Sequence, residues 1–342
     1  MFSLWKQARH MYTDQQILAL VERYMHGSDH PDQVGYREQT KGRDFANKTI
    51  FLDRLKSLAR LGHFQNKRIL DVGCGFGWHA FVIALMGNRV TGIDILPGMI
   101  EGMKDSIATM RREGISFDLS AVCGDICSTE LQAGSFDAIY SNEAIEHVRD
   151  LSAMFARCRD LLKPGGSLFL INDANVLNRK TREEITEMWE LREHSWDWVA
   201  QLKKWRPVEH AEAKPFAVMR EEIVRLANPR LDPAAVKIIV TNTAGLIKPE
   251  IEQIAINYKP GFSFPEIGTY DRCRNPETGE YAERLLDPFA LSKMLKKLGF
   301  RKTQVRHYFR RFPLNFTNGI QFRPINNLLF DLRGVFIVVG KV

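Results

Sequence analysis

The stretch Ile69-Leu70-Asp71-Val72-Gly73-Cys74-Gly75-Phe76-Gly77 decides how this 342-residue chain is expected to fold. It joins a short apolar strand to three glycines at alternate positions. Glycine lets the backbone turn sharply and approach a ligand closely. A helix expected from about Trp78 directs its first amides at the same place. Alone, this pattern fits either a tight strand-to-helix turn or a nucleotide-binding turn, and the neighbouring segments decide between them.

Short apolar strands alternate with helical segments around this turn. Strands are expected at residues 68–72, 89–94, 117–123, 136–141, 167–172 and 301–309, with a last apolar run at 334–340. Pro164-Gly165-Gly166 provides the turn into the fifth strand. Such alternation is typical of a doubly wound α/β fold with a mostly parallel sheet, here of seven strands.

Three parts of the chain differ in pattern. Helices are expected at residues 14–25, with Asp14 as N-cap, and at about 44–61, 181–205, 219–227 and 288–298, whereas 26–42 is polar and 258–281 reads as loop or short hairpin. We therefore expect an N-terminal helical appendage or lid (1–44), an α/β core (45–172 and 287–342) and a helical and loop insert (173–286).

Composition indicates an ordinary folded protein. Hydrophobic residues make up 44% and charged residues 26%. No apolar run of membrane-spanning length and no secretory signal are recognised. Five cysteines without a paired Cys-x-x-Cys spacing argue against a disulfide framework or a zinc site, so a reducing cytosol is the expected location.

Two acidic residues and one departure from the dinucleotide-binding pattern narrow the class of ligand that this turn is expected to bind. Asp94 ends the second strand, where a carboxylate can accept hydrogen bonds from both hydroxyls of a ribose. A dinucleotide enzyme would share this feature, but the third glycine comes one position too early for G-x-G-x-x-G because position 78 is Trp. Asp71, directly before the turn, is also unusual for that class.

The chain here resembles the class I S-adenosylmethionine-dependent methyltransferases. Asp71–Gly77 is similar to their motif I, Asp94 to the ribose-binding acid, Asp125 to the adenine-binding residue, and Phe136–Ser141 to motif IV. Leu161–Gly166 and Lys297–Phe300 agree as well, so the resemblance covers about 45–172 and 287–342. It implies S-adenosylmethionine as cofactor, bound by Asp71, Gly73, Cys74, Gly75, Gly77, Asp94, Ile95, Asp125, Ile126, Ser141 and Asn142.

A general base is expected near the end of the fourth strand. Glu143, Glu146 and His147 fall on adjoining parts of one expected helical turn. A neutral imidazole can accept the proton of an acceptor hydroxyl, whereas methyl transfer itself depends mainly on alignment. His147 is therefore the candidate base, with Glu143 and Glu146 beside it. The alternative is a histidine that caps or packs beside the cofactor.

The string Glu143-x-x-Glu146-His147 is also similar to one in ubiquinone-pathway O-methyltransferases and small-RNA 2′-O-methyltransferases, where it can hold a divalent metal. Two carboxylates and an imidazole suit such an ion. His194 and His210 of the insert are further potential ligands. We expect no metal at this site. The alternative is a divalent ion bound by Glu143, Glu146 and His147.

The insert is expected to form the acceptor cap. Trp189 and Trp196 are candidate substrate contacts, with a core role as the alternative, and Tyr36 and Arg37 could close over the cofactor as a lid. The first hypothesis is O-methylation of a small molecule or glycan in the pocket so formed. N-methylation, acting mainly by proximity, would need His147 less.

A basic C-terminal segment supports a second hypothesis. Residues 288–342 carry eleven Lys or Arg against one acid, interleaved with aromatic residues. Arginines pair with phosphates and bases stack on aromatic rings, so an RNA methyltransferase is the alternative, against the simpler interpretation of a solvated basic face. A third hypothesis is a non-catalytic cofactor-binding protein, which the intact motifs argue against.

Overall fold

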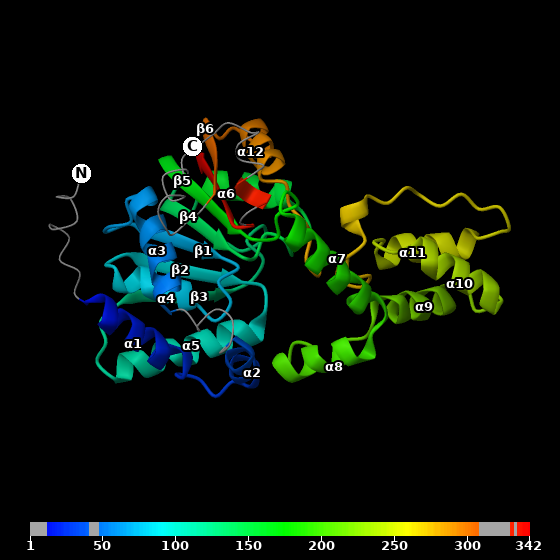
Figure 1. The fold of residues 1–342 in the computed structure, drawn as a ribbon, viewed down its shortest axis with the longest axis horizontal. Coiled ribbons are helices and arrows are strands. Elements are labelled where there is room, and N and C mark those ends of the chain that lie inside the picture. Colours follow the sequence, from blue (N-terminus) through cyan, green and yellow to red (C-terminus); the bar gives the residue numbers. More distant parts are fainter. Residues whose placement is uncertain (1–11, 41–47, 308–328, 332–333) are drawn as a thin grey trace.

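The fold is built on one seven-stranded sheet with the strand order β3-β2-β1-β4-β5-β7-β6 (Figure 1). The computed structural model describes residues 12–40, 48–307, 329–331 and 334–342. β7 runs antiparallel to both of its neighbours, and the other described pairings are parallel. The α/β fold with a mostly parallel, seven-stranded sheet is therefore confirmed.

The strands lie close to their predicted positions except at the start of β5, where Pro164-Gly165-Gly166, predicted as a turn, lies within the strand. They are β1 (Arg68–Val72), β2 (Arg89–Asp94), β3 (Asp118–Cys123), β4 (Phe136–Asn142), β5 (Leu162–Asn172), β6 (Lys302–His307) and β7 (Phe336–Lys341). Strand order reverses between β1 and β4, and ligands of open α/β sheets bind at such a switch point, beyond the carboxyl ends of the strands. The glycine turn after β1 therefore lies where this fold places its ligands.

Two apolar layers hold helices against the sheet. The helices of the core are α3 (Lys48–Gly62), α4 (Trp78–Leu85), α5 (Pro97–Arg112), α6 (Leu151–Leu161) and α12 (Pro288–Lys297). Strand residues alternate between the layers: Phe169 packs with α3, α4 and α5, and Leu168 packs with α6 and α12. Each face of the sheet is thus buried, as a parallel sheet requires.

The N-terminal part contains two helices where one was predicted. In α1 (Asp14–Met25) the N-cap is Thr13, not Asp14, because the Thr13 hydroxyl accepts the amide of Gln16 in a capping box. The polar stretch 26–42, predicted without structure, contains α2 (Pro31–Thr40). Gln33 of this helix is fully buried and donates to the Met25 carbonyl and the Ser106 hydroxyl. Tertiary contacts therefore stabilise a helix that the apolar pattern does not reveal.

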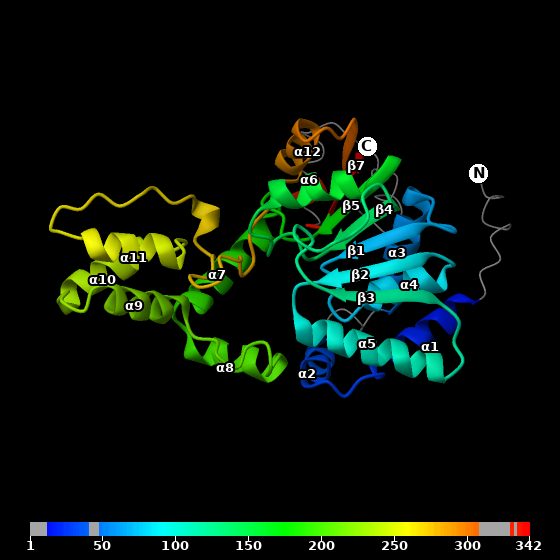
Figure 2. The same cartoon turned by 180° about the vertical axis from the view of Figure 1, so that it is seen from behind.

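The insert is mostly helical and extends away from the sheet. α7 (Arg179–His194) leads outward, α8 (Trp196–Trp205) folds back toward α2, and α9 (Phe216–Ala227), α10 (Pro233–Asn242) and α11 (Lys248–Asn257) form a separate lobe (Figures 1 and 2). The predicted helix 181–205 is broken at Ser195, which has extended backbone and caps α8 through its hydroxyl. α10 and α11 were not predicted. They pack with α9 around their own apolar core.

One buried ion pair links the lobe to α7. Arg220 of α9 is fully buried, and its guanidinium donates two hydrogen bonds to the Glu193 carboxylate and a third to the Val240 carbonyl. Satisfying all of these groups matters because an unpaired buried charge is costly. The lobe is therefore fixed to the end of α7.

Much of the basic segment lies outside the described residues, including Tyr308, Phe309, Arg310, Arg311, Phe312, Phe316, Phe322, Arg323 and Arg333. The RNA hypothesis that rests on them stays a prediction. In the described part of the chain, no helix is both long and apolar enough to span a membrane.

Candidate active site

The glycine turn after β1 is a left-handed bend. Gly73, Gly75 and Gly77 have φ values of 71°, 53° and 75°, a region that other residues rarely adopt. A Cβ on Gly75 would meet only the Met99 sulfur, at 3.6 Å, so its backbone is open to a ligand. Cys74 instead points inward, with its sulfur 3.7 Å from that of Met103. Its thiol is therefore a packing group.

Two carboxylates flank the bend. Asp94 ends β2 and accepts the amide of Gly75 at 2.8 Å and that of Leu96 at 3.0 Å. Burial raises the pKa of Asp94, although these two amides oppose the shift. Asp71 is 2% exposed, and no hydrogen bond to its carboxylate is found among the described residues. Burial, followed by repulsion from Asp94, raises the pKa of Asp71 well above its ordinary value.

The remaining cofactor candidates line the same edge of the sheet. Ile95 is a large apolar side chain that is 51% exposed beside Asp94. Asp125 is exposed and accepts the amide of Cys127 at 2.8 Å, and Ile126 next to it is buried. Ser141 is fully buried and donates to the Val72 carbonyl at 2.8 Å.

Asn142 lies at the end of β4, adjoining β1 at the switch point. Its Oδ1 atom is buried without a hydrogen-bond partner in the described part of the chain. An unsatisfied buried amide oxygen costs free energy unless a ligand supplies a donor. The open glycine bend, the Asp71 carboxylate and this oxygen therefore fit a polar, cationic ligand at the edge of the sheet.

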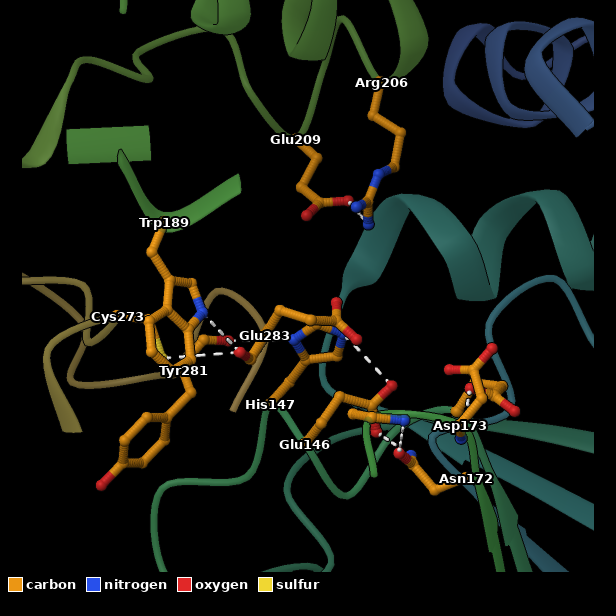
Figure 3. Close-up of polar contacts among 12 residues, drawn as sticks. Glu146, His147, Asn172, Asp173, Trp189, Arg206, Glu209, Cys273, Tyr281 and Glu283 are labelled. Carbon is orange, nitrogen blue, oxygen red and sulfur yellow. Dashed lines mark hydrogen bonds and ion pairs between the residues drawn. The ribbon is translucent and has the colours of Figure 1, made fainter. Parts of the chain in front are cut away.

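A second group of polar side chains lies after β4. The His147 Nε2 atom is 3.8 Å from the Glu146 carboxylate and 3.9 Å from that of Glu283 (Figure 3). His147 Nδ1 lies 2.9 Å from the Tyr281 carbonyl, which can only accept, so Nδ1 carries the proton and Nε2 has the free lone pair of the neutral ring. Asn172 at the end of β5 donates to Glu146.

Charges within this group favour a protonated imidazole. Burial opposes protonation of His147, but the Glu146 and Glu283 carboxylates and the Tyr281 carbonyl outweigh it and raise the pKa of His147. Burial raises the pKa of Glu146 and of Glu283 as well. The site can therefore take up a proton at Nε2 and stabilise it there.

The structure changes the membership of the predicted carboxylate–histidine set. Residues 145–147 form a single turn, whereas Glu143 lies in a bend with a left-handed φ of 49°, so the expectation that the three residues share one helical turn is wrong. Glu143 Oε2 accepts the Asp173 amide at 3.3 Å, and Glu283 of the insert takes its place beside His147. The group of metal-ligand atoms found within 4.8 Å of one another in the described ranges is Glu146, His147 and Glu283, without His194 or His210.

Trp189 and Trp196 have different surroundings. Trp189 is 9% exposed, and its indole Nε1 donates to the Glu283 carbonyl at 2.7 Å. It therefore supports the segment that carries Glu283. Trp196 is 56% exposed at the start of α8. Nothing in the sequence connected Glu283 with His147, whereas Asn172, a polar residue ending a strand, could have been noticed.

The N-terminal α2 contacts the insert directly. A Cβ on Gly35 would lie 2.2 Å from the Trp205 carbonyl oxygen, so the two backbones are in close contact. The buried Asp32 carboxylate accepts the amides of Val208 and Glu209 at 2.8 and 3.2 Å. Tyr36 packs against Phe76 of the glycine turn, with ring centroids 5.7 Å apart. Arg37 donates to the Met25 carbonyl. α2 thus bridges the glycine turn and the insert.

Comparison with known proteins agrees with this geometry. Residues 70–170 match a family model described as a methyltransferase domain. Residues 70–170 of this chain therefore form a methyltransferase domain. The match runs from β1 to β5 and so includes the glycine bend, Asp94 and His147, whereas the insert lies outside it.

Curated relatives match about a third of the chain. The chain is 40% identical over 114 residues to a ubiquinone biosynthesis O-methyltransferase of Xanthomonas axonopodis pv. citri, covering 33% of this chain and 44% of that protein. It is 37% identical over 131 residues to the protein of the same name from Xanthomonas campestris pv. campestris, covering 37% and 49%. The chain thus spans about half the length of the curated relatives it matches.

Two matched solved structures are more distant in sequence. An S-adenosylmethionine-dependent methyltransferase from Mesorhizobium loti is 17% identical, with a TM-score of 0.42 over 85% of this chain and 96% of that one. Phosphoethanolamine N-methyltransferase 2 from Haemonchus contortus is 15% identical, with a TM-score of 0.45 over 98% and 58%.

Proposed function

We propose that this protein transfers the methyl group of S-adenosylmethionine to a hydroxyl of a small-molecule or glycan acceptor, with His147 as general base. One observation carries the proposal. The His147 Nε2 atom faces two carboxylates that stabilise its protonated form, close to the edge of the sheet that holds the glycine bend. The O-methyltransferase names of the curated relatives support the same reaction class.

The residues at the sheet edge fit the cofactor in chemistry. The cofactor supplies an electrophilic methyl group on a sulfonium. The uncompensated Asp71 carboxylate suits its ammonium group, Asp94 its ribose hydroxyls, and Ile95 with Asp125 its adenine. The open backbone at Gly75 lets the methionine moiety lie against the bend.

Proton removal is the step that this chain's own side chains perform. His147 takes the acceptor's proton at Nε2 while Nδ1 stays bonded to the Tyr281 carbonyl, which fixes the ring. Glu146 and Glu283 stabilise the imidazolium that results. Holding the acceptor oxygen in line with the methyl carbon supplies most of the remaining acceleration.

The insert and α2 are proposed to cover the acceptor. Glu283 and its supporting Trp189 come from the insert, and α8 lies against α2. The His147 side chain is 47% exposed in the structure, so the bound acceptor itself would complete the exclusion of water from the reacting oxygen. Trp196 and the lid residues Tyr36 and Arg37 are proposed acceptor-side positions.

The proposal is tested by incubating the full chain with methyl-labelled S-adenosylmethionine and separate pools of small molecules, glycans and RNA. We expect label in a small hydroxylated compound or glycan, in a methyl ether that is stable to base. Label confined to RNA or to amine nitrogen would contradict the proposal.

Treatment with a chelator shows whether His147 acts as a general base or as a metal ligand. A neutral imidazole with a free Nε2 lone pair accepts a proton without the help of an ion, and Glu146 is already hydrogen-bonded to Asn172. We therefore expect turnover in the labelling assay to stay within about twofold after exhaustive treatment with EDTA, since Nε2 acts as a proton acceptor. Loss of turnover that Mg²⁺ or Mn²⁺ restores would instead assign Glu146, His147 and Glu283 as metal ligands.

A further inference from the structure

The insert presents cationic side chains to the His147 group. Arg192 lies on α7 and Arg206 directly follows α8. Arg206 interacts electrostatically with both His147 and Asp94, and Arg192 with Glu283. Figure 3 shows Arg206 reaching from the insert toward the segment that carries Glu283 and His147. Charges of the insert and of the core therefore share one site.

These charges are close without being paired to each other. Within the described ranges, no ion pair of 4.0 Å or less joins Arg192 or Arg206 to Glu283. Arg206 is paired instead with Glu209 on its own loop, at 2.7 Å. A ligand bound between the arginines of the insert and the His147 group of the core would contact both.

Arg192 has no ion-pair partner within 4.0 Å among the described residues, although the Glu209 and Glu283 carboxylates act on it at longer range. Its guanidinium lies over the Phe216 ring, 5.4 Å from the centroid, and makes no hydrogen bond or ion pair with any described residue. Burial, followed by repulsion from Arg206, lowers the pKa of Arg192 to about 10. The Arg192 guanidinium is partly buried, and its five N–H donors are not used by any described residue, so two of them are available to an anion.

Two further side chains of the insert, His210 and Glu209, lie near the two arginines. The His210 ring is 12% exposed, and its Nε2 lies 3.5 Å from the Glu209 carboxylate without forming a hydrogen bond. Burial and the two arginines lower the pKa of His210 to about 3, so the ring is neutral. Glu209 is the carboxylate of this loop and is already bonded to Arg206. The Asp32 carboxylate of α2 also contacts this loop, through the amides of Val208 and Glu209, so the unused donors on the insert side of the site are those of Arg192.

We propose that Arg192 binds an anionic group of the acceptor, a carboxylate or a phosphate, so that the acceptor's hydroxyl is held at His147. This inference rests on the proposed function and narrows its substrate to small hydroxylated anions. A guanidinium can hold such a group through two parallel hydrogen bonds, which fixes orientation as well as position. Arg206 adds long-range attraction. Arg192 is then a specificity-determining residue.

Arginine modification by phenylglyoxal locates the anion on the full chain. Inorganic phosphate and acetate are compared with chloride at equal ionic strength, and modification is quantified for each arginine by peptide mass spectrometry. We expect phosphate or acetate to slow modification of Arg192 by about fivefold or more, because a bidentate pair shields the guanidinium. Arg230, an exposed arginine of the insert, should react equally in all three salts. Protection by phosphate alone assigns a phosphate acceptor, and protection by acetate a carboxylate.

A variant gives a second measurement. Arg192→Met keeps an unbranched stem against Phe216 and should weaken the protecting anion's binding, followed by thermal shift, by about tenfold, the loss of one charge-assisted pair. Arg230→Met should bind the anion as the wild type does, and both variants should keep their affinity for S-adenosylhomocysteine. Equal anion binding in Arg192→Met together with unprotected Arg192 in the wild type would overturn the inference. Neither measurement uses methyl transfer, so anion binding without transfer would contradict only the proposed function.

Discussion

Asp94→Asn is expected to weaken cofactor binding about 100-fold, because an amide removes the charge-assisted hydrogen bonds that a carboxylate makes to a ribose. The amide also offers one acceptor oxygen where Asp94 now accepts the amides of Gly75 and Leu96. The glycine bend therefore loses support at the same time. Calorimetric titration with S-adenosylhomocysteine measures the change.

Asp118→Asn provides the matched control for this change. Asp118 begins β3 on the neighbouring strand and is ion-paired with Arg89 in solvent. Its replacement should leave cofactor affinity unchanged. If Asp94→Asn bound the cofactor as tightly as Asp118→Asn, the ribose would have to be held elsewhere.

His147→Ala is expected to lower turnover by about 10²- to 10⁴-fold, the usual contribution of a positioned general base. The ring contacts Glu146, Glu283 and the Tyr281 carbonyl, all on the acceptor side of the site, so cofactor affinity should not change. Turnover is measured with labelled cofactor and the acceptor found in the labelling assay.

His194→Ala is the control for the base. His194 lies exposed at the end of α7, outside the carboxylate–histidine group. It should keep wild-type turnover. Full turnover in His147→Ala would show that alignment alone drives the reaction and would remove His147 as the base.

Local patterns predicted the core because they depend on neighbours in sequence. The strand around Leu70 and the turn at Gly73 were visible in apolar runs and glycine spacing, and the structure places both as predicted. The helix α2 was not visible, because its buried residues are polar. Asp32 accepts amides of the loop that follows α8, and the Gln33 amide nitrogen donates to Ser106 of α5, which no local pattern shows.

The composition of the carboxylate–histidine group depended on long-range contacts. Tyr281 contacts His147 across 134 residues of sequence, and Glu283 arrives with it. Glu143 follows a helix-like spacing, but it lies in a bend and its carboxylate bonds the Asp173 amide instead. Sequence could therefore propose the base but not its second carboxylate. Arg192 also escaped notice, since an arginine on a helix becomes informative only when its burial and missing partner are known.

A crystal structure of the protein with S-adenosylhomocysteine tests the central claim most directly. The account predicts adenosine between Asp94 and Asp125 and the amino acid moiety against Gly75, with its ammonium at Asp71. Ligand bound away from the carboxyl ends of β1 and β2, with Asp94 contacting only its own backbone amides, would contradict it.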